Sequence, residues 1–103
     1  MQINVKGWKT IYSSSNYKLT INGTIAKLVF TLNDESTPIP ITFESFGEFT
    51  IPSNYRPSAQ VSSPAYSGNN ILLAVMPNGQ IVRRSMTGSK FYCGVWGTIH
   101  WIY

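Results

Sequence analysis

Hydrophobic and polar residues alternate along most of this chain, which is the pattern of β-strands that bury one face. Helical spacing is nearly absent, and proline or glycine interrupts the chain at short intervals. The segments between these breaks are rich in β-branched and aromatic residues, so they predict about eight strands in an all-β domain. The predicted strands cover residues 8–12, 17–21, 24–32, 41–43 with 47–51 across a kink at Gly47, 58–63, 71–76, 80–85 and 91–103.

Three turn sequences predict how neighbouring strands are connected. Asn22-Gly23 is the strongest short signal for a β-hairpin, because it suits the positive backbone angles of a two-residue loop. Pro77-Asn78-Gly79 predicts a second turn, and Thr87-Gly88-Ser89 a third. Strands 80–85 and 91–103 are therefore expected to pair with each other.

The last predicted strand has the most regular alternation. Its odd positions are mostly apolar and are expected in the core, whereas its even positions form an aromatic and polar stripe. The odd set is Phe91, Cys93, Val95, Gly97, Ile99, Trp101 and Tyr103; the even set is Tyr92, Gly94, Trp96, Thr98, His100 and Ile102. A bulge at Gly94 or Gly97 would exchange the two faces beyond it.

Residues 71–76 are apolar at every position, which predicts a strand that is covered on both faces. A second cover is hard to supply within so short a chain, so a neighbouring subunit is the expected source. With roughly ten residues per strand, the pattern favours two packed antiparallel sheets in a jelly-roll-like β-sandwich.

Composition adds a surplus of aromatic rings to this picture. The chain has 103 residues, which is one domain, and contains 3 Trp, 6 Tyr and 5 Phe. A core of this size does not absorb so many rings, so some are expected at a contact surface. The net charge of +4 suits an anionic partner, but only Arg83 and Arg84 are adjacent, which is unlike the basic stripe of a nucleic-acid binder.

Several protein classes are disfavoured by what the chain lacks. Cys93 is the single cysteine, which excludes an intrachain disulfide scaffold. The first residues have no apolar signal-peptide region, and no apolar run is long enough to cross a membrane, so membrane insertion is not expected.

Catalytic and metal-binding groups are sparse. Cys93 and His100 fall on opposite faces of one predicted strand, which separates a possible nucleophile from its base. Glu44 and Glu48 would lie roughly 13 Å apart in an extended strand, farther than a glycosidase pair. No spacing of His, Cys or acidic residues suits a metal, and no glycine-rich phosphate loop occurs. We therefore expect no enzymatic activity, no cofactor and no metal site.

Saccharide binding is better supplied. Sugars stack on Trp or Tyr rings while Arg, His or Asn groups bond their hydroxyls. The candidate site residues are Trp96, His100, Tyr92, Arg83 and Arg84. By parity one of the two arginines should face the core and the other solvent. The alternative for the aromatic stripe is burial between subunits.

Two further residues have structural interpretations. Arg56 is interpreted as fixing a turn by bonding nearby carbonyls. Trp8 is interpreted as capping one end of the sandwich.

The order of three segments resembles the C-terminal head domains of phage tail-fibre and baseplate receptor-binding proteins, in particular those of phages that infect Gram-positive lactic-acid bacteria. The segments are residues 17–32, residues 49–57 with Tyr55-Arg56-Pro57, and residues 71–82. The resemblance implies a homotrimer in the virion, at the distal tail or baseplate, assembled in the host cytoplasm. Residues 1–7 would join a shaft, and residues 8–103 would form the head.

The same resemblance implies a function in host recognition without catalysis. Its partners would be bacterial cell-wall polysaccharide or a teichoic-acid-like polymer, together with other tail or baseplate proteins. Two other hypotheses stay open beside it: a structural trimerisation or attachment module, and an unrelated β-barrel that binds single-stranded nucleic acid. The last is the weakest, because the basic residues do not line a groove.

Overall fold

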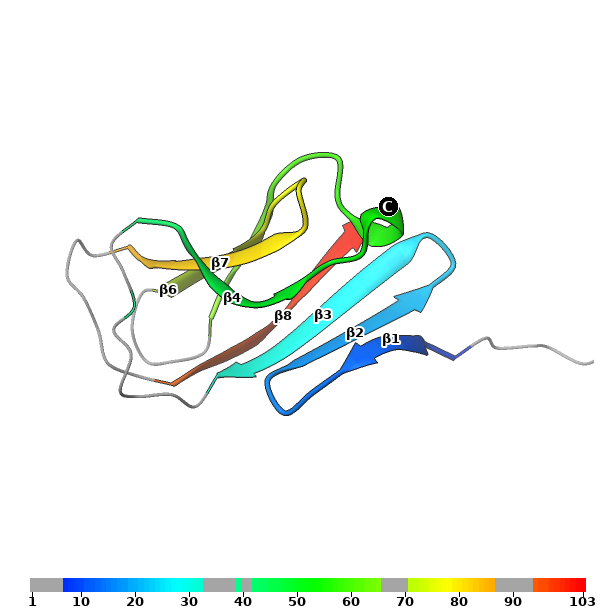
Figure 1. Ribbon diagram of the computed structural model, residues 1–103, viewed down its shortest axis with the longest axis horizontal. Helices are drawn as coiled ribbons and strands as arrows, with labels where there is room; N and C mark the ends of the chain where they lie inside the picture. The colour runs from blue at the N-terminus through cyan, green and yellow to red at the C-terminus, as the bar shows by residue number, and fades with distance from the viewer. Residues whose placement is uncertain (1–6, 33–38, 40–41, 66–70, 87–93) are drawn as a thin grey trace, which may run out of the picture.

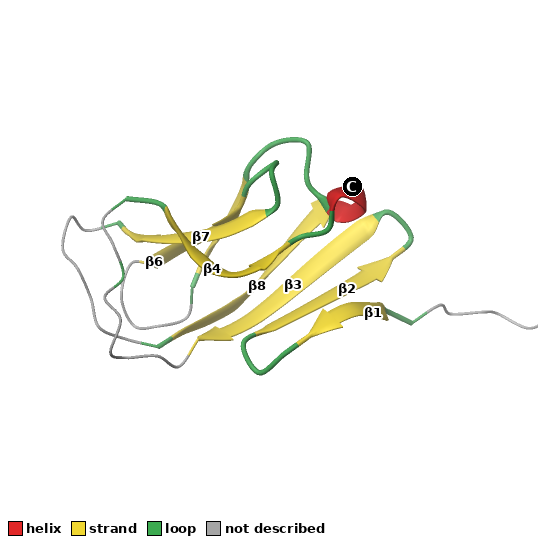
Figure 2. Cartoon of the chain, in the orientation of Figure 1, coloured by secondary structure: helices red, strands yellow, loops and turns green. Residues whose placement is uncertain are grey.

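The computed structural model describes residues 7–32, 39, 42–65, 71–86 and 94–103. In this part the protein is all-β, with eight strands in two four-stranded antiparallel sheets and one short 3-10 turn (Figures 1 and 2). The first sheet has the order β1-β2-β3-β8, and the second has the order β4-β7-β6-β5. The elements are β1 (Lys9–Ser13), β2 (Tyr17–Asn22), β3 (Ile25–Leu32), β4 (Glu44–Thr50), η1 (Ser53–Tyr55), β5 (Val61–Pro64), β6 (Ile71–Val75), β7 (Gln80–Ser85) and β8 (Val95–Ile102). The predicted antiparallel β-sandwich of about eight strands is confirmed.

The hairpin at Asn22-Gly23 is confirmed, and its turn lies one residue later than predicted. Asn22 pairs with Ile25, so the loop between β2 and β3 is Gly23-Thr24. Gly23 has φ +61°, a left-handed conformation that glycine adopts without steric cost. Two short strands were predicted at residues 41–43 and 47–51, and the structure has one strand, β4 (Glu44–Thr50), instead. Thr42 and Phe43 precede it and belong to no strand, and Ile41 lies outside the described residues.

The alternation predicted for the last strand is also confirmed over β8. Val95, Ile99 and Trp101 are buried, whereas Trp96, His100 and Ile102 are exposed. The pairing of β8 with β3 runs without a register shift, so the faces are not exchanged at Gly97. Phe91, Tyr92 and Cys93 lie outside the described residues.

The predicted pairing of strands 80–85 and 91–103 is wrong. β7 lies between β4 and β6, and β8 instead pairs along its whole length with β3 in the other sheet. β3 buries Ala26, Leu28 and Phe30 in the core, which matches the apolar face of β8. Consecutive strands are neighbours only about two-thirds of the time. The short segment between residues 85 and 91 was therefore not sufficient evidence that the two strands pair.

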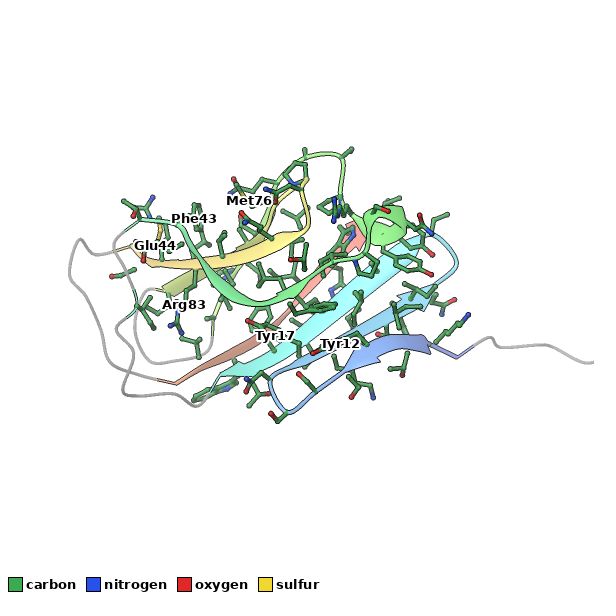
Figure 3. All side chains as sticks on the ribbon, viewed as in Figure 1. Tyr12, Tyr17, Phe43, Glu44, Met76 and Arg83 are labelled. Carbon is green, nitrogen blue, oxygen red and sulfur yellow. The ribbon has the colours of Figure 1, made fainter. Side chains whose placement is uncertain are left out.

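The chain itself covers part of the second face of β6, where a neighbouring subunit was the expected cover; Leu72 on this face stays partly exposed, and a subunit contact there stays a prediction. Ile71, Leu73 and Val75 face the first sheet, and Ala74 on the opposite face is also fully buried within the single chain. Its partner on β7, Val82, is 5% exposed. Phe43 and Met76 lie on this side of the second sheet (Figure 3), so the chain supplies part of the cover.

The core between the sheets is closed along both sides. On one side β5 packs beside β8, and an added Cβ at Gly97 would lie 3.3 Å from the Phe30 ring and 3.7 Å from the Pro64 carbonyl oxygen. On the other side the rings of Tyr12 and Phe49 stack, with centroids 3.9 Å apart, and join β1 to β4. The face of the first sheet that points away from this core is left to solvent.

Candidate functional site

Most of the large hydrophobic residues that are exposed in the described part of the chain lie on one face. We define the outer face as the side chains of the first sheet that point away from the second sheet. It carries four of the five large hydrophobic residues that are exposed in the described part of the chain: Trp8 (40% exposed), Ile25 (43%), Trp96 (48%) and Ile102 (74%). The fifth, Met86, follows β7. The prediction that part of the aromatic surplus lies at the surface is therefore confirmed by two tryptophans.

Trp8 lies across the outer face rather than capping an end of the sandwich. Its ring centroid is 4.6 Å from the Lys27 ammonium nitrogen on β3 and 6.4 Å from the centroid of the His100 ring on β8. Trp8 precedes β1, so its side chain must pass over β2 to reach both residues. A cation above an indole ring is a favourable arrangement, so Lys27 helps to hold the ring in place.

A row of polar residues runs across the four strands beneath this ring. The register pairs Thr10 with Thr20, Thr20 with Lys27, and Lys27 with His100. Thr20 is 5% exposed although it belongs to the outer face. In the register it lies between Thr10 on β1 and Lys27 on β3, on the path by which the Trp8 side chain reaches Lys27. Its hydroxyl oxygen has no hydrogen-bond partner within the described residues.

The structure divides the predicted saccharide site between two sheets. Trp96 and His100 lie on the outer face, four residues apart along β8, which is roughly 13 Å in an extended strand. Tyr92 lies outside the described residues.

The two arginines belong to the second sheet and face in opposite directions, as parity predicted. Arg83 is 5% exposed and points toward the first sheet (Figure 3). Arg84 points away from it, with its guanidinium carbon 5.6 Å from the Phe43 ring centroid. Neither arginine reaches the outer face, so the proposed joint site with Trp96 and His100 is not assembled.

Arg56 has the turn-fixing role that was predicted. Its Nε donates a hydrogen bond of 2.8 Å to the Ile51 carbonyl oxygen, and the Ile51 amide donates one of 2.9 Å to the Gly79 carbonyl. The short turn η1, which directly precedes Arg56, is held to the end of β8, because the Trp101 indole N–H donates a hydrogen bond to the Tyr55 carbonyl. The segment around Tyr55 and Arg56 is thus a structural joint between the two sheets.

Catalytic or metal-binding constellations are not found in the described residues. No group of three His, Cys, Asp or Glu side chains there could hold a metal ion. Glu44 is exposed at the start of β4, and Asp34, Glu35, Cys93 and the Glu48 side chain are not described. The described elements also include no helix with the length and apolar character needed to cross a membrane.

The sequence did not identify three residues of the outer face as site residues: Thr20, Lys27 and Trp8. Trp8 was instead expected to cap one end of the sandwich. Alternation placed Lys27 on the solvent side of its strand, and this was the available signal. The register that aligns it with Thr20 and His100 depends on the long-range pairing of β3 with β8.

In comparisons with protein-family models, curated proteins and solved structures, nothing matches this chain.

Proposed function

We propose that this protein is a non-enzymatic binding domain that holds a saccharide on its outer face. The observation that carries the proposal is the presence of two half-exposed tryptophans, Trp8 and Trp96, on one sheet face beside hydrogen-bonding side chains. An exposed indole presents a flat apolar surface on which a sugar ring can stack. A monomer gains nothing in stability from such exposure, so a contact is the better explanation.

The spacing of these groups favours an extended ligand. Trp96 lies at one end of β8, Thr98 follows on the same face, and His100 lies beside the Trp8 ring near the other end. The roughly 13 Å between Trp96 and His100 exceeds the width of one sugar ring. A chain of linked sugars would contact both tryptophans, whereas a monosaccharide would contact one.

The biological setting that we propose is the head of a phage tail or baseplate protein, which forms a homotrimer in the virion and has bacterial cell-wall polysaccharide as its receptor. This part rests on the resemblance of residues 17–32, 49–57 and 71–82 to such heads. The first sheet would then present the outer face to the host surface.

A second candidate function is a trimerisation or attachment module of the tail without receptor binding. The observation that favours it is the directly opposed pair Ile25 and Ile102, at one end of the outer face. Ile102 is 74% exposed, and paired aliphatic side chains suit a protein contact better than a sugar.

A glycan array combined with sedimentation separates the two functions. The array holds neutral and acidic bacterial oligosaccharides and is probed with the wild type, Trp96→Ala and Ile102→Lys. Saccharide binding predicts that the wild type binds extended glycans and that Trp96→Ala loses at least about tenfold in affinity, because a stacked ring is removed. Ile102→Lys should then retain binding.

The structural module predicts the reverse result. No glycan would bind, and sedimentation would show a wild-type oligomer that Ile102→Lys converts to monomers. That outcome would exclude the receptor-binding proposal.

A further inference from the structure

Three hydrogen-bonding side chains lie next to one another in the middle of the outer face. Thr20 on β2 is directly opposite Lys27 on β3, and Lys27 is directly opposite His100 on β8. Opposed residues of neighbouring antiparallel strands have Cβ atoms about 4.5–5.5 Å apart. A hydroxyl, an ammonium group and an imidazole therefore follow one another in a row across three neighbouring strands, and all three can donate a hydrogen bond.

The buried hydroxyl of Thr20 is the first indication that this cluster serves a ligand. Its Oγ1 is inaccessible to solvent and has no hydrogen-bond partner within the described residues, although Thr20 belongs to a solvent-facing sheet surface. A buried polar group without a partner is unfavourable, and native proteins satisfy most such groups. Valine has nearly the same shape and would avoid the loss, so the hydroxyl has a use that the unliganded fold does not provide.

The charge of the surface is the second indication. Lys27 is half-buried, and it has no carboxylate partner in the described part of the chain. No Asp or Glu belongs to the described residues of the outer face, and Glu44 lies in the second sheet. A partly desolvated ammonium group attracts an anion more strongly than one in bulk water.

We infer that Thr20, Lys27 and His100 form an anion subsite, which selects saccharides that carry a phosphate or a carboxylate group. The inference rests on the proposed function and specifies its ligand. Lys27 supplies the charge, His100 and Thr20 donate hydrogen bonds to the anion, and the Trp8 ring moves to lie against the attached sugar.

Binding of defined polymers to the intact chain tests this subsite by titration calorimetry. The probes are a glycerol phosphate polymer, polygalacturonate, neutral dextran and an oligothymidylate. The subsite predicts that the phosphate or the carboxylate polymer binds at least about tenfold more tightly than dextran, which corresponds to one charged hydrogen bond. The two anionic polymers show which acid is preferred.

Matched variants separate the subsite from the general positive charge. Lys27→Met should weaken binding of the anionic polymer about tenfold, since it removes the ammonium group and keeps an apolar stem on the Trp8 ring. Lys9→Met is the control, because Lys9 is exposed, is paired with Ile21 and therefore does not belong to the outer face, and its loss changes the net charge equally. It should change affinity less than about twofold, since exposed charges act weakly.

Thr20→Val provides a readout that damage to the fold would not imitate. It should weaken binding of the anionic polymer while the thermal midpoint stays unchanged or rises, because an unpartnered buried hydroxyl is removed.

The remaining outcomes overturn the subsite in distinguishable ways. Equal binding of dextran, or equal effects of Lys27→Met and Lys9→Met, would refute the subsite and leave saccharide binding intact. Failure of all three saccharide polymers to bind would refute both proposals. Tightest binding of the oligothymidylate would replace them with a nucleic-acid function.

Discussion

The close packing around Gly79 leads to a quantitative prediction for Gly79→Ala. Gly79 has φ +86°, and a Cβ added there would lie 2.5 Å from the Arg56 Nε and 2.6 Å from the Ile51 carbonyl oxygen. The methyl group would therefore meet the two atoms that form the hydrogen bond between Arg56 and Ile51. Substitution should separate the turn between β6 and β7 from the segment that follows β4.

The expected loss combines two contributions. An alanine in the left-handed region costs about 1–2 kcal/mol. Disrupting a hydrogen bond from a charged donor costs about 1.5–3 kcal/mol. The free energy of unfolding should therefore fall by about 2.5–5 kcal/mol, and the thermal midpoint by roughly 10 °C or more for a domain of this size.

Gly23→Ala is the matched control for this experiment. Gly23 also has a positive φ, +61°, but nothing lies within 4 Å of the added Cβ. It should lose only the conformational part, about 1–2 kcal/mol. Urea unfolding followed by fluorescence measures both variants. Equal losses at the two glycines would refute the role of the joint formed by Arg56, Ile51 and Gly79.

Two further predictions concern aromatic residues of the core and its edges. Trp101→Phe should lower the free energy of unfolding by about 2–3 kcal/mol, because the Tyr55 carbonyl loses its hydrogen-bond donor. Trp96→Phe on the exposed face is the control and should change the free energy of unfolding by less than about 0.5 kcal/mol. Chemical denaturation measures both variants, and equal effects would contradict the assigned hydrogen bond. A double-mutant cycle of Tyr12→Leu and Phe49→Leu should give a coupling free energy of unfolding of about 0.5–1.5 kcal/mol, as expected for stacked rings. If the two losses of stability are additive, the stack does not join β1 to β4.

Local sequence patterns were sufficient for several parts of this fold. The alternation along β8 correctly assigned Val95 and Trp101 to the core and Trp96 and His100 to solvent. Parity correctly predicted that Arg83 and Arg84 face opposite sides of their strand, although it did not say which of them faces the core. These predictions succeeded because the direction of a side chain in a strand depends on its neighbours in sequence and on little else.

The site could not be predicted in the same way, since it depends on which strands pair. The alternation along β8 is compatible with either β7 or β3 as its neighbour. Because β8 pairs with β3, Arg83 and Arg84 on β7 lie in the other sheet and not on the face of Trp96. The position of the Trp8 ring depends on the same pairing, because Lys27 and His100 are neighbours only when β3 and β8 are adjacent. The burial of the Thr20 hydroxyl also depends on how the strands are arranged, so the alternation of polar and apolar residues along β2 does not predict it.

The pairing of β3 with β8 has a consequence for how the protein is made. The paired residues are separated by more than sixty positions in the chain, so the first sheet stays incomplete until β8 has left the ribosome. During that interval β3 presents free backbone groups and an apolar side that can capture the same strand of another nascent molecule. A lower rate of expression should therefore increase the yield of folded protein, because fewer nascent chains with an unpaired β3 are then present to aggregate with one another.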